Sequence, residues 1–160
     1  MIREPESNPS DNPFLRKRQA VKTRVLLVML PQRRTPLVRI LEQNGMEVVA
    51  AGDFLEAQEK LGKAGSYDLV FVDADLPGGS WKMLLQDILD SRCPCEIIVC
   101  SRIADEHLWA EVLQCGAYDL VGEPYDERQV ADVANNALHS RHLQRFARVA
   151  THPVPDRMAS

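Results

Sequence analysis

The sequence predicts an α/β fold, a doubly wound parallel sheet in which five strands alternate with five helices. Three observations indicate it. Short apolar runs alternate with amphipathic helical patterns from residue 24 onward. Each strand-plus-helix unit takes roughly 20 to 25 residues, which is the usual spacing in such folds. Residues 69–72 are wholly apolar, as expected of a strand that helices cover on both faces.

The five strands are predicted from apolar runs that end at turn residues or charged residues. Pro31 ends the first run, and the third run ends on Asp73, which a Pro-Gly-Gly loop follows. The predicted strands are, in chain order, residues 24–30, 47–51, 67–73, 96–101 and 119–121. Because ligands bind at the carboxyl ends of parallel strands, Asp73 is a candidate functional carboxylate.

The five helices are predicted from capping residues and from apolar residues at helical spacing. The predicted N-caps are Thr35, Asp53, Ser80, Asp105 and Asp126. Asn44-Gly45, Gly65 and Cys115-Gly116 are the predicted ends of the first, second and fourth helices. The predicted core positions are Leu37, Val38, Ile40 and Leu41; Leu55, Ala57 and Leu61; Met83, Leu84, Ile88 and Leu89; Leu108, Val112 and Cys115; and Val130, Val133, Ala134, Ala137 and Leu138.

Length and composition indicate one domain between two tails. We expect a disordered tail at residues 1–21, the domain at residues 22–140, and a helix extension with a tail at residues 141–160. This leaves no room for an output domain, so we expect the domain to stand alone. The net charge of −4 and the absence of a long apolar run argue against nucleic acid and membrane partners. Without a signal peptide, the cytoplasm is the expected location, with reduced cysteines.

Several motifs occur together in a characteristic order. They are Leu69-Val70-Phe71-Val72-Asp73, Leu76-Pro77-Gly78, Ser101 after an apolar strand, Gly116-Ala117, and Pro124-Tyr125. With these motifs, residues 24–139 resemble a response regulator receiver domain of two-component signalling, in the CheY-like superfamily. The resemblance implies a flavodoxin-like sheet of strand order 2-1-3-4-5 and a role in a phosphorelay.

The resemblance also assigns roles to individual residues. Asp73 takes the position of the phosphoacceptor, and Ser101 that of the hydroxyl that bonds a phosphoryl oxygen. Family members bind Mg²⁺ through an acidic pair after the first strand, the phosphoacceptor and one backbone carbonyl, which here would come from Asp75.

Five positions depart from the family pattern. They are Met29 and Leu30 at the acidic pair, Arg102 at a usually small residue, Leu120 at the aromatic switch and Glu123 at the conserved lysine. Mg²⁺ requires oxygen ligands, so the sequence predicts no metal cofactor and an atypical, degenerate receiver (a pseudo-receiver). We further expect Arg102 to pair with Asp73 or Glu123.

We therefore expect a stand-alone atypical receiver domain, and not an enzyme. Its partner would be a signalling protein, namely a histidine kinase, a phosphotransfer protein or a downstream effector. The expected contact face is formed by the helix of residues 105–114, the strand of residues 119–121 and the final helix, with Trp109, Leu120 and Tyr125 as contact residues. A homodimer through the same face is a further expectation.

Two alternatives remain open. The first is a protein-interaction module that acts without phosphorylation. The second, more remote, is a phosphatase of the haloacid dehalogenase type, since Asp73-Ala74-Asp75 matches its first motif. However, Pro77 departs from that motif, and the later strand ends lack its paired acids.

Overall fold

The structure, a computed structural model, describes residues 22–62, 67–76, 80–91 and 95–150, with side chains up to residue 140. It contains the predicted parallel sheet of five strands, in the order β2-β1-β3-β4-β5. The strands are β1 (Arg24–Val28), β2 (Glu47–Ala51), β3 (Leu69–Asp73), β4 (Glu96–Ser101) and β5 (Asp119–Gly122). The helices are α2 (Pro31–Gln43), α3 (Phe54–Gly62), α4 (Trp81–Ser91), α5 (Glu106–Gln114) and α6 (Glu127–Ala150).

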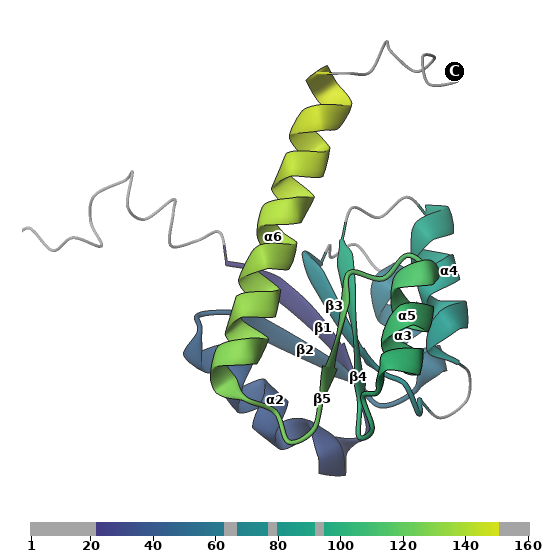
Figure 1. The fold of residues 1–160 in the computed structure, drawn as a ribbon, viewed down its shortest axis with the longest axis vertical. Coiled ribbons are helices and arrows are strands. Elements are labelled where there is room, and N and C mark those ends of the chain that lie inside the picture. Colours follow the sequence, from purple (N-terminus) through teal and green to yellow (C-terminus); the bar gives the residue numbers. More distant parts are fainter. Residues whose placement is uncertain (1–21, 63–66, 77–79, 92–94, 151–160) are drawn as a thin grey trace, which may run out of the picture.

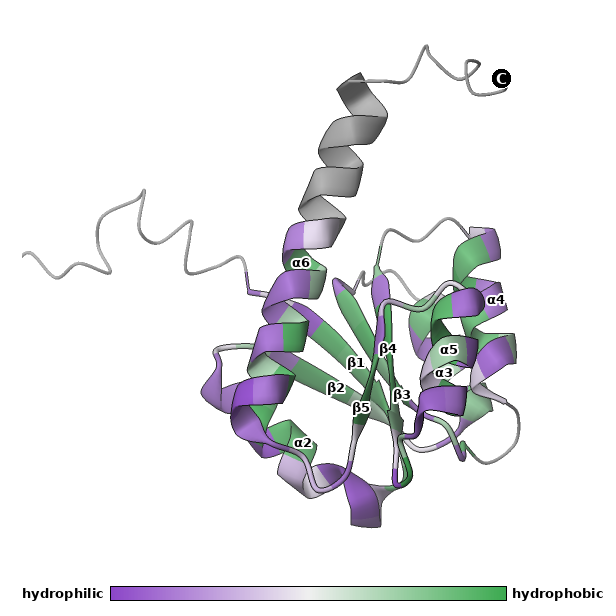
Figure 2. Ribbon diagram, in the orientation of Figure 1, coloured by the Kyte–Doolittle hydropathy of each residue, from purple (hydrophilic) through white to green (hydrophobic). Residues whose placement is uncertain are grey.

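The helices form two layers around the sheet, with α2 and α6 on one face and α3, α4 and α5 on the other (Figure 1). Alternate residues of β1 face the two layers: Leu26 and Val28 pack under α3 and α4, and Val25 and Leu27 under α2 and α6. Apolar residues are concentrated in the strands and polar ones on the outer helix faces (Figure 2). The wholly apolar strands are thus explained by burial on both faces.

The register of the strands brings their carboxyl ends to one edge of the sheet. Asp73 at the end of β3 pairs with Cys100, and Ser101 at the end of β4 pairs with Gly122 at the end of β5. The β4–α5 and β5–α6 connections meet closely there. A Cβ atom on Gly122 would lie 2.6 Å from the Cβ atom of Ala104, so only glycine fits at this position.

Four of the five predicted helix caps are confirmed. Asp53, Ser80, Asp105 and Asp126 each accept a hydrogen bond from a backbone N–H of the first turn.

The fifth cap prediction, Thr35, is wrong, because α2 begins one turn earlier at Pro31. Proline suits the first helical position, where its missing N–H would have no partner anyway. As a result β1 ends at Val28, earlier than predicted.

Two predicted core stripes also need correction. Met83 and Leu89 are 54% and 48% exposed, because α4 buries Trp81, Leu84, Leu85 and Ile88 instead. That set has regular i, i+3, i+4, i+7 spacing from Trp81. In α3, Leu55 is exposed, and Phe54 occupies the inner position.

The predicted boundary between the domain and the helix extension, at residue 140, lies within α6, which runs to Ala150 and projects beyond the sheet (Figure 1). The predicted tail at residues 1–21, Gly65 and residues 151–160 lie outside the described residues. Within the described part of the chain, no helix is both long and apolar enough to span a lipid bilayer.

Candidate functional site

Asp73 lies at the end of β3 with only 1% of its surface exposed. Its Oδ1 atom accepts a hydrogen bond of 3.1 Å from the backbone N–H of Asp75. A buried carboxylate is costly unless it is paired with a cation or with several donors. The other partner of Asp73 therefore determines what this site can do.

That partner is Arg33, in the first turn of α2. Its Nη1 atom donates to Asp73 Oδ2, and its Nη2 atom donates to Glu123 Oε2 at 3.1 Å. The Arg33 side chain is 15% exposed, so one partly buried guanidinium bridges the two carboxylates. Burial lowers the pKa of Arg33, but the hydrogen bonds and the negative charges of Asp73 and Glu123 together raise it by more, so the guanidinium stays charged.

The helix itself directs Arg33 toward the sheet. Arg33 precedes Leu37 by four residues and Ile40 by seven, and both of these are buried, so all three share one face of α2. A cation is unfavourable in the first turn of a helix, where the macrodipole favours acids. The two carboxylates offset this cost.

Sequence reasoning missed Arg33, although a signal was present. The first turn of α2 contains two arginines and no acid. Such a first turn is a reason to look for a carboxylate partner nearby.

The prediction that Arg102 pairs with Asp73 or Glu123 is wrong. Among the described residues, both carboxylates have Arg33 as their ion-pair partner, and Arg102 is exposed without one. Arg102 follows the end of β4 and is exposed to solvent. Arg33 instead reaches the crevice along the buried face of α2.

The residues present do not fit a Mg²⁺ ion. Met29 is fully buried at one position of the acidic pair, and Leu30 occupies the other without a side-chain oxygen. One oxygen of Asp73 is bonded to Arg33 and the other to Asp75. Within the described residues, no three acidic, histidine or cysteine side chains cluster as metal ligands would.

The Ser101 hydroxyl is engaged in its own loop. Its Oγ atom donates to the carbonyl of Ile103 at 2.9 Å and accepts from the Ile103 N–H at 3.0 Å. Ser101 is buried, and these bonds fix the turn between β4 and α5. Its geometry suits a structural hydroxyl that satisfies backbone groups.

The buried floor of the site contains Cys100 and Tyr125. The Tyr125 hydroxyl lies close to the Cys100 thiol, in the layer under α2 and α6. Burial, and then the nearby Asp73 charge, raise the pKa of Cys100 above its usual range. Burial also raises the pKa of Tyr125, so both groups stay protonated at neutral pH.

The three predicted partner-contact residues have different positions. Trp109 on α5 is 49% exposed, and its indole N–H donates to Asp119 Oδ1 at 3.3 Å. Leu120 is only 7% exposed and packs under α5, so its prediction as a contact residue needs correction: a strand residue pointing at a covering helix cannot meet a partner. Tyr125 is half-buried and packs on the opposite face of the sheet from Leu120.

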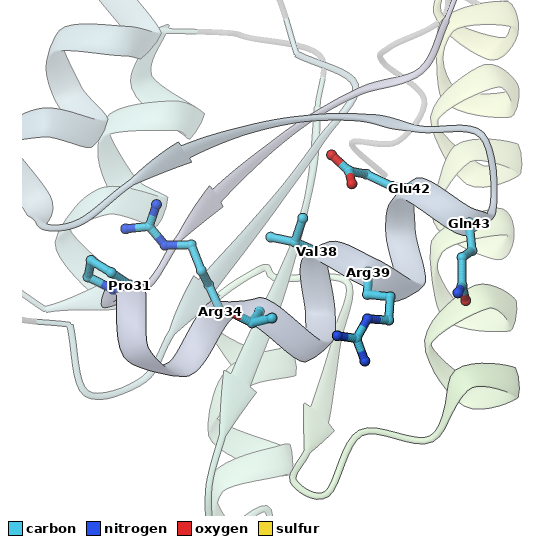
Figure 3. A pocket seen from close by; sticks show the side chains of 7 residues that line it. Pro31, Arg34, Val38, Arg39, Glu42 and Gln43 are labelled. Atoms are coloured by element: carbon cyan, nitrogen blue, oxygen red, sulfur yellow. The ribbon is translucent and has the colours of Figure 1, made fainter.

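Two cavities lie near α2. One of about 480 Å³ is beside the Arg33 bridge and is lined by Gln32, Arg33, Pro36, Arg102, Glu123, Pro124 and Tyr125. The other, of about 600 Å³, follows the outer side of α2, where Arg34, Val38 and Glu42 point to the same side (Figure 3). None of the predicted site residues lines this second cavity.

Comparison with known proteins identifies the family of this fold. The family model described as "Response regulator receiver domain" matches residues 31–135. The chain is 33% identical over 101 residues to the chemotaxis protein CheY of Bacillus subtilis. The matched residues are 62% of this chain and 83% of CheY.

Solved structures show the same fold. The signal receiver domain of a putative LuxO repressor protein from Vibrio parahaemolyticus superposes with a TM-score of 0.71 at 19% identity, covering 79% of this chain and 98% of that one. A CheY-like receiver domain protein from Methanospirillum hungatei gives a TM-score of 0.68 at 22% identity, covering 78% of this chain and 99% of that one.

Proposed function

The chain belongs to the response regulator receiver domain family of two-component signalling, and from this premise we propose that it is an atypical member that signals through protein contact without Mg²⁺-dependent phosphorylation of Asp73. The observation that carries the proposal is the Arg33 guanidinium, which bridges Asp73 and Glu123. It occupies the oxygen that a phosphoryl donor or a metal would need.

The chemistry of the crevice supports this proposal. Phosphoryl transfer depends on positioning and on neutralising the charge of the transferred group. Here the acidic pair is replaced by Met29 and Leu30, and the lysine by Glu123, whose carboxylate repels a phosphoryl group. The Ser101 hydroxyl is already bonded to the backbone of its own loop. Each of these changes lowers the rate of phosphorylation.

The proposed contact surface is the exposed side of α5 beside the edge strand β5. Trp109 and Leu113 are four residues apart on α5, and both are partly exposed. A large aromatic residue fixed by one hydrogen bond, as Trp109 is by Asp119, is a common interface anchor. The partner is a signalling protein, either a kinase, a phosphotransfer protein or an effector.

No observation favours the phosphatase alternative. Asp75, the second acid of that motif, is exposed and gives its backbone N–H to Asp73. Incubation with an aryl phosphate and Mg²⁺ should therefore release no phosphate above background.

The direct test is incubation of the full chain with acetyl phosphate and Mg²⁺, followed by intact mass spectrometry. We expect no phosphoryl adduct. The positive control is the quadruple variant Met29→Asp, Leu30→Asp, Arg33→Ala, Glu123→Lys, which restores the usual ligand types and removes the bridge. A stable adduct on the unmodified chain that is lost in Asp73→Asn would overturn the proposal.

The surface has a separate test. Trp109→Ala should abolish capture of a cognate signalling partner, whereas Asp73→Asn should retain it at the temperature where both variants are folded. Met83→Ala is the matched control, because Met83 is a comparably exposed apolar residue on α4. Equal loss of capture in Trp109→Ala and Asp73→Asn would support a phosphorylation-dependent receiver instead.

A further inference from the structure

We propose that Arg33 is the positioning residue of this site, an internal cation that replaces both the metal ion and the lysine and holds the α5 contact surface in one state. This inference deepens the proposed function and rests on it. Three observations carry it: the charges in the crevice, the segments that Arg33 connects, and the contacts that lead from Glu123 to α5.

The first observation concerns charge. Asp73 and Glu123 bring two negative charges to one crevice, and Asp73 is almost completely buried. Like charges at short range in a poorly solvated site repel strongly. Arg33 supplies the opposing charge, and its planar fork presents one nitrogen to each carboxylate. A lysine ammonium has no such fork.

The second observation concerns connectivity. Arg33 is in the first turn of α2, the helix that follows β1, Asp73 ends β3, and Glu123 follows β5. One side chain therefore ties three segments of the chain at the carboxyl edge of the sheet. These are the segments through which a ligand at this edge would act on the fold.

The third observation is a chain of contacts from Glu123 to α5. The Glu123 N–H donates to the Ser101 carbonyl at 3.0 Å, and Gly122 packs tightly on Ala104. Ala104 precedes Asp105, which caps α5 and whose carbonyl accepts the N–H of Trp109 at 2.9 Å. A displacement of Glu123 thus reaches the helix that carries Trp109 through contiguous packing.

The experiment compares three arginine variants of the full chain labelled with 5-fluorotryptophan. The chain has two tryptophans, Trp81 and Trp109, and the Trp109→Phe variant assigns their fluorine resonances. Arg33→Met removes the bridge. Arg39→Met is the matched control, because Arg39 is an exposed arginine on the same helix and its loss changes the charge equally. Arg33→Lys keeps the charge but not the fork.

We expect Arg33→Met to shift the Trp109 resonance and to lower the melting temperature by about 10 °C, because a buried carboxylate loses its cation. Arg39→Met should change neither the Trp109 resonance nor the melting temperature, and Arg33→Lys should give an intermediate change in both. The melting temperature of the unmodified chain should be the same in Mg²⁺ and in chelator. If Arg33→Met is unfolded, Glu123→Gln should shift the Trp109 resonance in the same direction as Arg33→Lys does, since Glu123 is partly exposed and the amide keeps the volume.

An unchanged Trp109 resonance in the folded Arg33 or Glu123 variants would overturn the inference, as would an equal shift in Arg39→Met. Failure of the proposed function is seen separately. If acetyl phosphate modifies Asp73 in the unmodified chain while Trp109 still responds to Arg33, the proposed function is wrong and the positioning role of Arg33 holds.

Discussion

The ion pair between Arg33 and Asp73 predicts a large coupling free energy in a double-mutant cycle. The cycle consists of the unmodified chain, Arg33→Met, Asp73→Asn and the double variant. Each single change removes one charge of a buried pair, and the double variant removes both. Because the residues are in direct contact, their effects on the free energy of unfolding should not add.

The burial of the two side chains sets the magnitudes. Arg33→Met leaves the Asp73 carboxylate, 1% exposed, without its cation, which should cost about 4 kcal/mol. Asp73→Asn should cost about 2 kcal/mol, because the amide oxygen can still accept hydrogen bonds and Arg33 keeps Glu123. The double variant should be about as unstable as Arg33→Met alone, which gives a coupling of about 2 kcal/mol.

The assay is urea denaturation at neutral pH, followed by circular dichroism. The ion pair between Lys82 on α4 and Glu111 on α5 provides a control within the same chain, because both of its side chains are solvent-exposed to a large extent. Its cycle (Lys82→Met, Glu111→Gln) should show a much smaller coupling, since water screens exposed pairs. If the coupling of the buried pair is no larger than that of the exposed pair, the bridge does not organise the site.

Three further predictions concern the strand ends. Gly122→Ala should lower the free energy of unfolding by about 1–3 kcal/mol, because its Cβ atom would lie 2.6 Å from that of Ala104; Gly62→Ala is the open-space control, and urea denaturation measures both. Burial raises the thiol pKa of Cys100, so above the ordinary pKa of 9.0 the folded state keeps a proton that the unfolded state loses. The free energy of unfolding should therefore be unaffected by this group below that pH and fall by about 1.4 kcal/mol per pH unit above it. In Cys100→Ala the free energy of unfolding should fall less steeply with pH. Ser101→Ala should cost about 1 kcal/mol in the same assay, because it removes two bonds to the backbone of its loop.

Local patterns were sufficient to predict the sheet and most of the helix starts. A cap such as Asp105 depends on the residues that directly follow it, so its hydrogen bond is visible in the sequence. The carboxyl-edge position of Asp73 was also predictable, because alternating strands and helices dictate a parallel sheet.

The partners of Asp73 were not predictable from local patterns. Arg33 reaches Asp73 across 40 positions of the chain, and its place on the buried face of α2 turns it toward the sheet. Arg102 was the expected cation by motif position, but it is exposed, and Arg33 holds both carboxylates instead. The predicted buried face of α4 was wrong for a related reason. Met83 and Leu89 have helical spacing, but so does a neighbouring set of residues that includes Trp81, and the helix buries that set instead.

The spacing between Arg33 and the buried face of α2 decides where the guanidinium points. An α-helix turns by about 100° per residue, so a single residue inserted between Arg33 and Leu37, with the buried face of α2 unchanged, would swing the guanidinium away from both carboxylates. The cation is therefore encoded by a length, the four-residue step from Arg33 to Leu37, as well as by an amino-acid type. Alignments that score only the acidic and lysine positions would overlook it. In this chain, an arginine four residues before the first buried leucine of α2 is a readable mark of a crevice neutralised from within.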